Sequence, residues 1–372
     1  MSRVRVGGGA CVDRLVCHPV LPLVAGEESR DIGCPVAHVW DFGGGRLREL
    51  GTVSAAGRGH SRWGFAMSWE PGESLLVAAN CEITGAAATV ARWTPSGVTG
   101  LAGLPPTYRY TYMEFSPDGR ALWASPSAGD PGWALSDIVD LATGTIWAGQ
   151  RWDTGVAVHP GGGLAATLAS EAGGTCLVFA RVDQGRGPAA MRLLRRAVLL
   201  DDDGYMPPVF SPDGRYLAIR GSSYGHFLHA FEFPSLRHVL ARDLDPRPAD
   251  MSYQELVDWF GAWARHNIAF GARPGVLWAG TPAGALIETD LDSGQAATHH
   301  VPGGSPVTAL AAAADGDLIV ATGAGELALV SVTAGHRTAP PPDALEAQAA
   351  AFLAGTSVVP DDRELWSHVV TG

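Results

Sequence analysis

Aromatic residues, several of them beside an arginine, recur seven or eight positions before a repeated turn in this sequence. Tyrosine, tryptophan and arginine are the residue types most enriched at the energetic centres of protein interfaces. Brought together, they would bind a protein or a peptide. The candidate binding residues are Arg62, Trp63, Tyr108, Arg109, Tyr110, Arg151, Trp152 and Tyr205, and His266 stands at the equivalent place before the sixth turn.

The same aromatic side chains could instead pack between neighbouring repeats, because buried aromatic residues usually serve packing first. Trp63, Tyr110 and Trp152 occupy equivalent places in three consecutive repeats, so the two interpretations differ most clearly there. The sequence leaves both of them open.

Motifs of enzymatic catalysis are missing from the chain. We find no Gly-x-Ser-x-Gly elbow, no Walker A loop, no His-Glu-x-x-His and no Cys-x-x-Cys. All 26 basic residues are arginine, so chemistry that depends on lysine is excluded. We therefore expect a protein that is not an enzyme.

Metal-ligating residues are dispersed, and we expect no metal or other cofactor. His226 and His229 are three apart in a predicted strand and would face opposite sides, while His299 and His300 are adjacent with no third ligand nearby. The run 201–203 of three aspartates could hold Ca²⁺, but it lacks the alternation of a calcium loop. A solvated acidic turn is the simpler interpretation.

The elements that must position these residues form a repeat. A short apolar strand, a Ser-Pro-Asp-Gly turn and a second strand occupy 113–123 and again 209–218, and five weaker copies follow the same plan. Proline fixes φ, aspartate bonds its own backbone, and glycine accepts a positive φ. One residue marks the turn of each repeat, and successive markers lie 41 to 62 residues apart. The markers are Pro19, Pro71, Pro117, Pro160, Pro212, Pro274 and Asp315.

A third apolar segment follows each pair of strands, for example at 36–42, 90–93, 137–141 and 286–291, and a fourth short strand closes the unit. Units of four antiparallel strands at this period are blades of a β-propeller. The sequence therefore predicts an all-β, seven-bladed β-propeller over residues 1–335. The alternating residues 3–6 could supply the outer strand of the seventh blade and so close the ring.

The sequence resembles the WD-repeat family over about residues 2 to 335. Trp40-Asp41 matches the dipeptide that names the family, Gly59-His60 matches its Gly-His element, and His18-Pro19 resembles a common variant of the first turn. The resemblance implies a propeller that works as a binding platform.

Two segments depart from the repeat. Ser252 and Glu255 have the spacing of a capping box, and apolar residues then recur at helical spacing, which predicts a helix over 252–265. Residues 336–372 form a proline-rich linker and an extension with a second helix over 343–353. Each helix could pack on the propeller or dock a partner, and apolar helix faces are usually buried.

The formal charge of −12 argues against nucleic acid as a partner, because binding to phosphate requires a basic face. No apolar run is long enough to span a membrane, and the first residues lack the apolar core of a signal peptide. Five scattered cysteines suit a reducing compartment, and arginine without lysine suits a GC-rich bacterial genome. We expect a cytoplasmic, bacterial protein.

The function that these observations predict is a non-catalytic scaffold that binds a protein or peptide. A propeller enzyme of the lactonase or hydrolase type is the alternative, and Glu114 and Asp153 are then the candidate inward-facing acids. A sensor domain that works with a separately encoded enzyme is a further alternative.

Overall fold

The computed structural model describes most of the chain. The described residues are 2–28, 35–56, 65–79, 82–83, 90–101, 104, 110–126, 135–171, 174–183, 188–200, 204–222, 225–301, 303–332 and 340–359.

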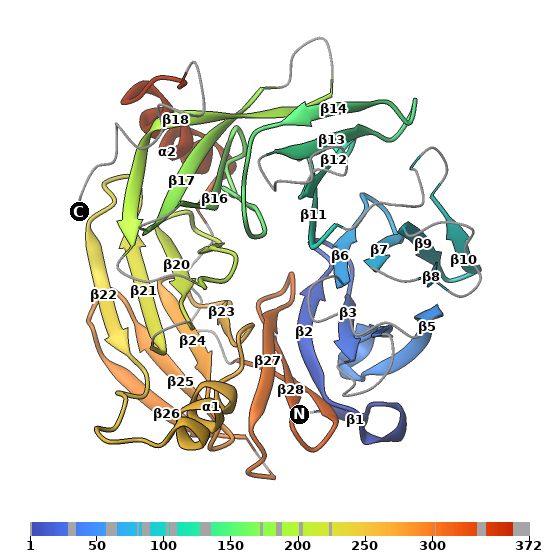
Figure 1. The fold of residues 1–372 in the computed structure, drawn as a ribbon, viewed down its shortest axis with the longest axis vertical. Coiled ribbons are helices and arrows are strands. Elements are labelled where there is room, and N and C mark those ends of the chain that lie inside the picture. Colours follow the sequence, from blue (N-terminus) through green and yellow to red (C-terminus); the bar gives the residue numbers. More distant parts are fainter. Residues whose placement is uncertain are drawn as a thin grey trace.

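Seven small antiparallel sheets of the described residues surround a common centre, so the chain is a seven-bladed β-propeller, as predicted (Figure 1). The first blade consists of β2 (Val12–Cys17), β3 (Leu23–Glu28), β4 (Val36–Asp41) and β5 (Arg48–Ala56), with β8 (Glu82–Ile83) paired to the end of β5. The second consists of β6 (Phe65–Trp69), β7 (Leu75–Ala79), β9 (Val90–Thr94) and β10 (Gly97–Gly100). The third consists of β11 (Tyr112–Phe115), β12 (Ala121–Ser125), β13 (Ser136–Asp140) and β14 (Ile146–Gly149).

The fourth and fifth blades consist of β15 (Ala157–Val158), β16 (Leu164–Glu171), β17 (Gly174–Asp183) and β18 (Ala190–Leu200); and β19 (Val209–Phe210), β20 (Tyr216–Arg220), β21 (Phe227–Glu232) and β22 (His238–Asp243). The last two consist of β23 (Ile268–Phe270), β24 (Val276–Gly280), β25 (Ala285–Asp290) and β26 (Ala296–His300); and β27 (Val307–Ala312), β28 (Leu318–Thr322), β29 (Glu326–Val330) and β1 (Ser2–Arg5).

The Ser-Pro-Asp-Gly turns form as their residue types predict. The Ser116 hydroxyl donates to Asp118 Oδ1 at 2.6 Å, and Gly119 takes φ of 67°. Ser211, Asp213 and Gly214 repeat this arrangement in the fifth blade. Each turn joins the first strand of its blade to the second and so fixes the register of the hairpin.

The ring closes where the sequence suggested. β1 pairs antiparallel with β29, Val4 opposite Leu327, and so becomes the outer strand of the seventh blade. The backbone N–H of Val6 donates to the carbonyl of Gly325 at 2.9 Å. Strands from the two ends of the propeller sequence therefore share one sheet, and this outer edge is paired.

Buried apolar side chains gather between the blades. Each of the seven apolar clusters among the described residues is built from two adjacent blades. One of them, which includes Trp40 and Ile319, joins the seventh blade to the first. A blade is one thin sheet, so it can bury its faces only against its neighbours.

The helix α1 (Tyr253–Ala262) begins at the predicted capping box, since Ser252 and Glu255 bond each other's backbone N–H groups. It packs on the fifth blade through Trp259 and Trp263, whose rings lie 4.3 and 5.6 Å from the ring of His226. His226 Nδ1 must accept from Arg220 at 3.1 Å because arginine only donates, so Nε2 carries the proton that is donated to the Trp259 carbonyl.

The helix α2 (Pro342–Ala354) also packs on the propeller. Phe352 is 1% exposed and lies 4.8 Å from the ring of Phe179 and 4.9 Å from that of Phe233. It thereby covers the junction of the fourth and fifth blades, behind β16, β17 and β18 in Figure 1. No helix among the described residues has the length and apolar character needed to cross a bilayer.

Substitution Val4→Asp tests the closure. Val4 packs on the cluster that joins the first and seventh blades, so a carboxylate there costs about 2 kcal/mol of unfolding free energy. We expect a lower denaturant midpoint in one cooperative transition followed by circular dichroism. The exposed neighbour Arg5 provides the control Arg5→Ser, which should leave the midpoint unchanged. A Val4→Asp midpoint equal to that of the native chain would refute the role of β1.

Candidate functional site

The aromatic residues named from the sequence are buried wherever the structure describes them. Tyr110, Trp152 and Tyr205 are 1%, 1% and 2% exposed. Each belongs to a cluster between two blades: the second and third, the third and fourth, and the fourth and fifth, respectively. The packing alternative accounts for all three, because such side chains offer almost no surface to a partner.

Polar contacts fix these aromatic residues further. The Tyr110 hydroxyl donates to Asp137 Oδ2 at 2.8 Å. Arg151 pairs with Asp153 at 3.2 Å and donates to the Ser170 carbonyl at 2.6 Å, so its guanidinium is held inside its own blade. Arg62, Trp63, Tyr108 and Arg109 lie outside the described residues, as do Gly59, His60 and the aspartates 201–203.

The histidines considered as metal ligands lie apart. His226 contacts α1, whereas His229 Nδ1 lies 3.0 Å from His238 Nε2. His299, on the exposed outer strand β26 of the sixth blade, lies 2.7 Å through its Nε2 from Oε2 of Glu288 in β25. Within the described parts of the chain, no three His, Cys, Asp or Glu side chains are grouped so that they could hold a metal ion.

Charged side chains gather instead where the first strands of several blades begin. These first strands contact their neighbours around the ring and form its inner wall. We define the channel cluster as Arg14 of β2, Glu27 of β3, Tyr112 and Glu114 of β11, and His266, which stands just before β23. All five side chains are partly exposed although the strands around them are buried.

Arg14 is the centre of the channel cluster. It lies directly opposite Glu27 in the β2–β3 register, and its guanidinium carbon is 5.7 Å from the centroid of the Tyr112 ring. Arg14 therefore reaches from the first blade to the third. Glu114 follows Tyr112 by two residues and lies on the same face of β11.

The charges of the channel cluster are not matched by close ion pairs. Among the described residues, no hydrogen bond or ion pair within 4 Å joins Arg14 to Glu27 or to Glu114. The same wall thus holds a cation and two carboxyl groups that act on one another only at longer range.

Burial shifts the ionisation of these groups. It raises the pKa of Glu114 to about 7, and the attraction of Arg14 opposes this only in part. Burial also raises the pKa of Glu27 to about 7, with Arg14 lowering it and Asp13 raising it. Near neutral pH each carboxyl is therefore about half protonated.

Burial also favours the neutral forms of His266 and Tyr112. Burial, and then the charges of Arg14 and Arg265, lower the pKa of His266 to about 3, so its imidazole is neutral. Burial likewise raises the pKa of Tyr112. Shifted groups of this kind are concentrated at functional sites, because binding and proton transfer exploit them.

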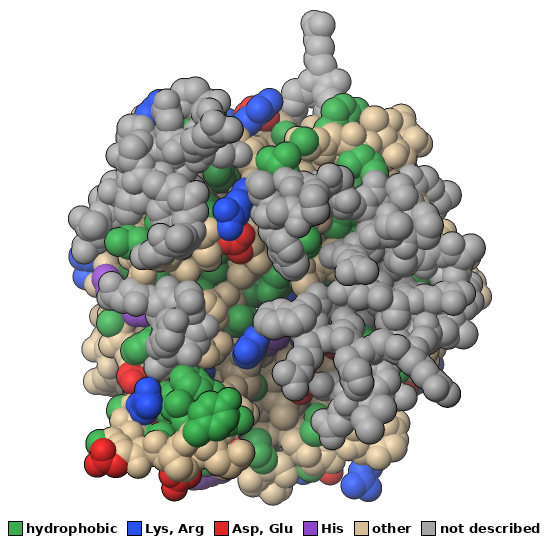
Figure 2. Space-filling view, in the orientation of Figure 1, with side chains coloured by type: hydrophobic (Ala, Val, Ile, Leu, Met, Phe, Trp, Pro, Cys, Tyr) green, Lys and Arg blue, Asp and Glu red, His purple; other side chains and the backbone are tan. Residues whose placement is uncertain are grey.

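His266 of the channel cluster lies a few residues after α1, so one face of the propeller carries both α1 and the mouth of the central channel. Figure 2 shows it hollowed near its centre, with basic and histidine side chains at the edge of the hollow over the segment between α1 and β23. Hydrophobic side chains gather over α1, where Tyr253 and Val257 are 81% and 45% exposed. A partner on this face would meet the apolar helix surface and the charged opening together.

A second buried charged group lies inside the first blade. His38 of β4 contacts Glu28 Oε2 at 2.7 Å through Nε2 and Glu49 Oε1 at 2.8 Å through Nδ1, and it stacks on Trp40. Both ring nitrogens are occupied, so this group ties three strands together and leaves no nitrogen for a ligand.

Comparison with protein-family models and with curated proteins finds no match for this chain. The functional argument therefore depends on the fold and on the channel cluster. The sequence interpretation named Glu114 and His266 but missed Arg14 and Glu27. The sequence contains a signal for both residues, because the charged pair Asp13-Arg14 interrupts an apolar strand. The register of the first hairpin then places Glu27 opposite Arg14.

Substitution Glu114→Gln tests the burial of this carboxyl. Its pKa is about 7 in the folded chain and near 4.5 in an ordinary glutamate, so the folded state binds more protons between these values. The free energy of unfolding therefore falls as pH rises through this window, and glutamine does not have this loss. We expect the stability of Glu114→Gln relative to the native chain to rise by on the order of 1–3 kcal/mol between pH 4.5 and 8.

Urea unfolding at both pH values measures this difference, with Glu73→Gln in an exposed turn as the control. A difference that stays constant with pH would show that Glu114 titrates as an ordinary glutamate.

Proposed function

We propose that this propeller is a non-catalytic scaffold that binds a protein or peptide at the face where α1 and the channel cluster lie. The single observation that carries the proposal is that Arg14, Glu27 and Glu114 of the channel cluster form no close ion pair within the described part of the chain. Burying charges is costly unless they are compensated, so a site that holds them without close partners is prepared for a charged ligand group.

The ligand group that fits best is cationic, such as a lysine or arginine side chain of the partner. The channel cluster holds two carboxyls and one central guanidinium, and neither carboxyl has an ion pair within 4 Å among the described residues. An incoming cation would favour the ionised carboxyls and so release protons near neutral pH. The net charge of −12 favours approach of a basic partner and disfavours nucleic acid.

The WD-repeat type is part of this proposal. Its support is Trp40-Asp41: Trp40 is fully buried in the third strand of its blade, and Asp41 accepts from the Gly43 backbone at 2.7 Å and pairs with Arg48 at 3.1 Å. The partial likeness of the His18-Pro19 turn adds to it, since His18 Nδ1 accepts from the backbone of Val20 and Leu21.

We also propose a cytoplasmic, bacterial setting with no membrane partner. Cys17 is a free thiol, which suits a reducing compartment. Burial raises the pKa of Cys17 to about 12, so this thiol stays protonated and unreactive.

Affinity capture with matched baits tests the function. The baits are the native chain, the double variant Glu27→Gln/Glu114→Gln, and the control Glu73→Gln. We expect the native chain and the control to retain the same partner and the double variant to bind it at least tenfold more weakly, as measured by calorimetry with the purified partner. Equal affinity for the double variant would exclude the channel cluster as the binding site.

A propeller hydrolase remains a second candidate because one observation favours it: a carboxyl with a pKa of about 7 could act as a general base at neutral pH. Assays with p-nitrophenyl acetate and γ-butyrolactone distinguish the two functions. Turnover that rises with a midpoint near pH 7 and is lost in Glu114→Gln would establish the enzyme and overturn the scaffold. We expect no turnover above background.

A further inference from the structure

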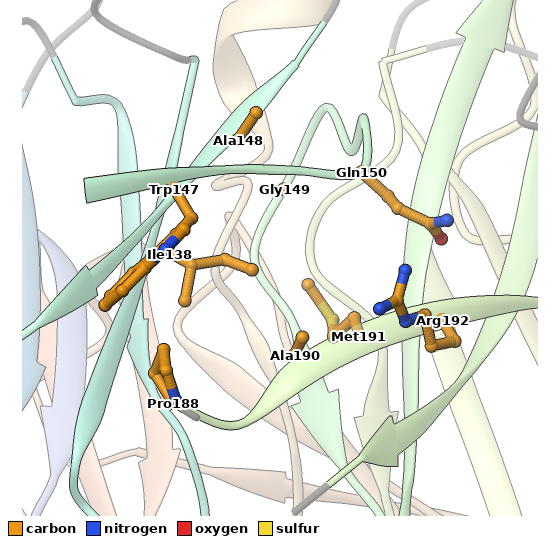
Figure 3. Close-up of a pocket in the computed structure, with 9 residues that line it drawn as sticks. All are labelled: Ile138, Trp147, Ala148, Gly149, Gln150, Pro188, Ala190, Met191 and Arg192. Atoms are coloured by element: carbon orange, nitrogen blue, oxygen red, sulfur yellow. The ribbon is translucent and has the colours of Figure 1, made fainter. Parts of the chain in front are cut away.

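A pocket of about 270 Å³ opens on the outer side of the ring, between β14 of the third blade and β18 of the fourth (Figure 3). Ile138, Trp147 and Pro188 lie at one end of it, and Gln150 and Arg192 lie at the other. The pocket therefore has an apolar end and a polar end. Because β14 and β18 are the outer strands of their blades, this pocket is separate from the channel cluster on the inner wall.

The apolar end is built on the third blade. Trp147 lies directly opposite Ile138 in the β13–β14 register, so the two side chains stand on the same face of the sheet. Ile138 is buried, whereas Trp147 is 41% exposed. An indole that is open to solvent above a buried aliphatic side chain offers a flat apolar surface, and an aromatic ring can stack on it.

A glycine keeps the pocket open between its two ends. Gly149 follows Trp147 by two residues and lies on the same face of β14. A Cβ at this position would lie 2.4 Å from Ser136 Oγ and 3.1 Å from Ile138 Cγ1, so a larger residue would require the wall to shift. The hollow beside Trp147 is therefore fixed by the packing of the strands.

The polar end presents two hydrogen-bond donors. The Leu193 N–H donates to Gln150 Oε1 at 2.5 Å, which fixes the orientation of this amide and leaves its NH2 group to donate. Arg192 precedes Leu193 in β18, and its side chain is 55% exposed. An amide NH2 group and a guanidinium only donate, so a carboxylate, with two acceptor oxygens, is the ligand group that fits this end best.

The charge around Arg192 also favours an anion. Arg192 pairs with Asp183 at 3.5 Å, and Arg181 lies directly opposite Arg192 in the β17–β18 register. Two guanidinium groups beside one carboxylate leave an excess of positive charge at this rim, among the residues that the structure describes. Since an exposed ion pair of this length contributes little to stability, the carboxylate of a ligand can replace that of Asp183.

We propose that this pocket binds a small aromatic carboxylate, with its ring against Trp147 and its carboxylate at Arg192 and Gln150. A short linker must join the ring to the carboxylate, because both ends belong to one pocket of about 270 Å³. That volume suits a ligand with a single ring better than a drug-sized molecule. The proposed site does not depend on the binding of a protein partner at the channel cluster.

Titration of the native full chain with hydrocinnamate tests the site. Nitrogen-15 NMR follows the indole N–H of Trp147, whose signal is assigned by its absence in Trp147→Phe. We expect a saturable shift with a Kd on the order of 1 mM, the affinity that a ligand of this size reaches. Hydrocinnamamide has the same ring and linker without the charge, and it should bind about fivefold more weakly or worse.

The variant Arg192→Gln tests the polar end, and it should weaken the binding of hydrocinnamate by about fivefold or more. Arg242→Gln is the matched control, because Arg242 is an exposed arginine of β22, the outer strand of the fifth blade, and it should leave the Kd unchanged. Any of three results would overturn the proposal: no saturable shift in the native chain, equal affinity for the amide, or equal effects of Arg192→Gln and Arg242→Gln.

Discussion

Packing between adjacent blades is the interaction on which the rest of this structure depends. A sheet of four short strands cannot bury both of its faces alone, and every apolar cluster among the described residues spans two blades. The pairing of β1 with β29 completes this series, because it gives the seventh blade its outer strand. The same constraint explains why Tyr110, Trp152 and Tyr205 are buried: their rings fill the junctions between blades.

The ring also determines where charge can act. Once the blades are packed, their first strands form the wall of the centre. Arg14, Glu27 and Glu114 on that wall lose water without gaining a close ion pair in the part of the chain that the structure describes. This is why Glu27 and Glu114 hold protons near neutral pH while His266 does not. A rigid wall that presents partly desolvated charges would bind a complementary group with little rearrangement, and the proposed scaffold requires this property.

Local chemistry made much of the fold predictable. The Ser-Pro-Asp-Gly turns, the third strands, the capping box at Ser252 and the closing strand β1 all depend on residues near one another in sequence or on a regular repeat. The channel cluster was not predictable in the same way, because Arg14 and Tyr112 meet only when the first and third blades share one ring. The antiparallel bridge between Val358 and Leu194 of β18 was not predicted, because it depends on where α2 ends, and packing on the propeller decides where α2 ends.

The central claim is that burial raises the pKa of the inner-wall carboxyl groups to about 7, so that they are about half protonated near neutral pH and could take up a cationic group. Carbon-13 NMR of the glutamate carboxyls, with the Glu114 resonance assigned by its absence in Glu114→Gln, measures this directly during a pH titration. The account predicts a midpoint near 7 for Glu114. A midpoint near 4.5, the value of an ordinary solvated glutamate, would contradict it.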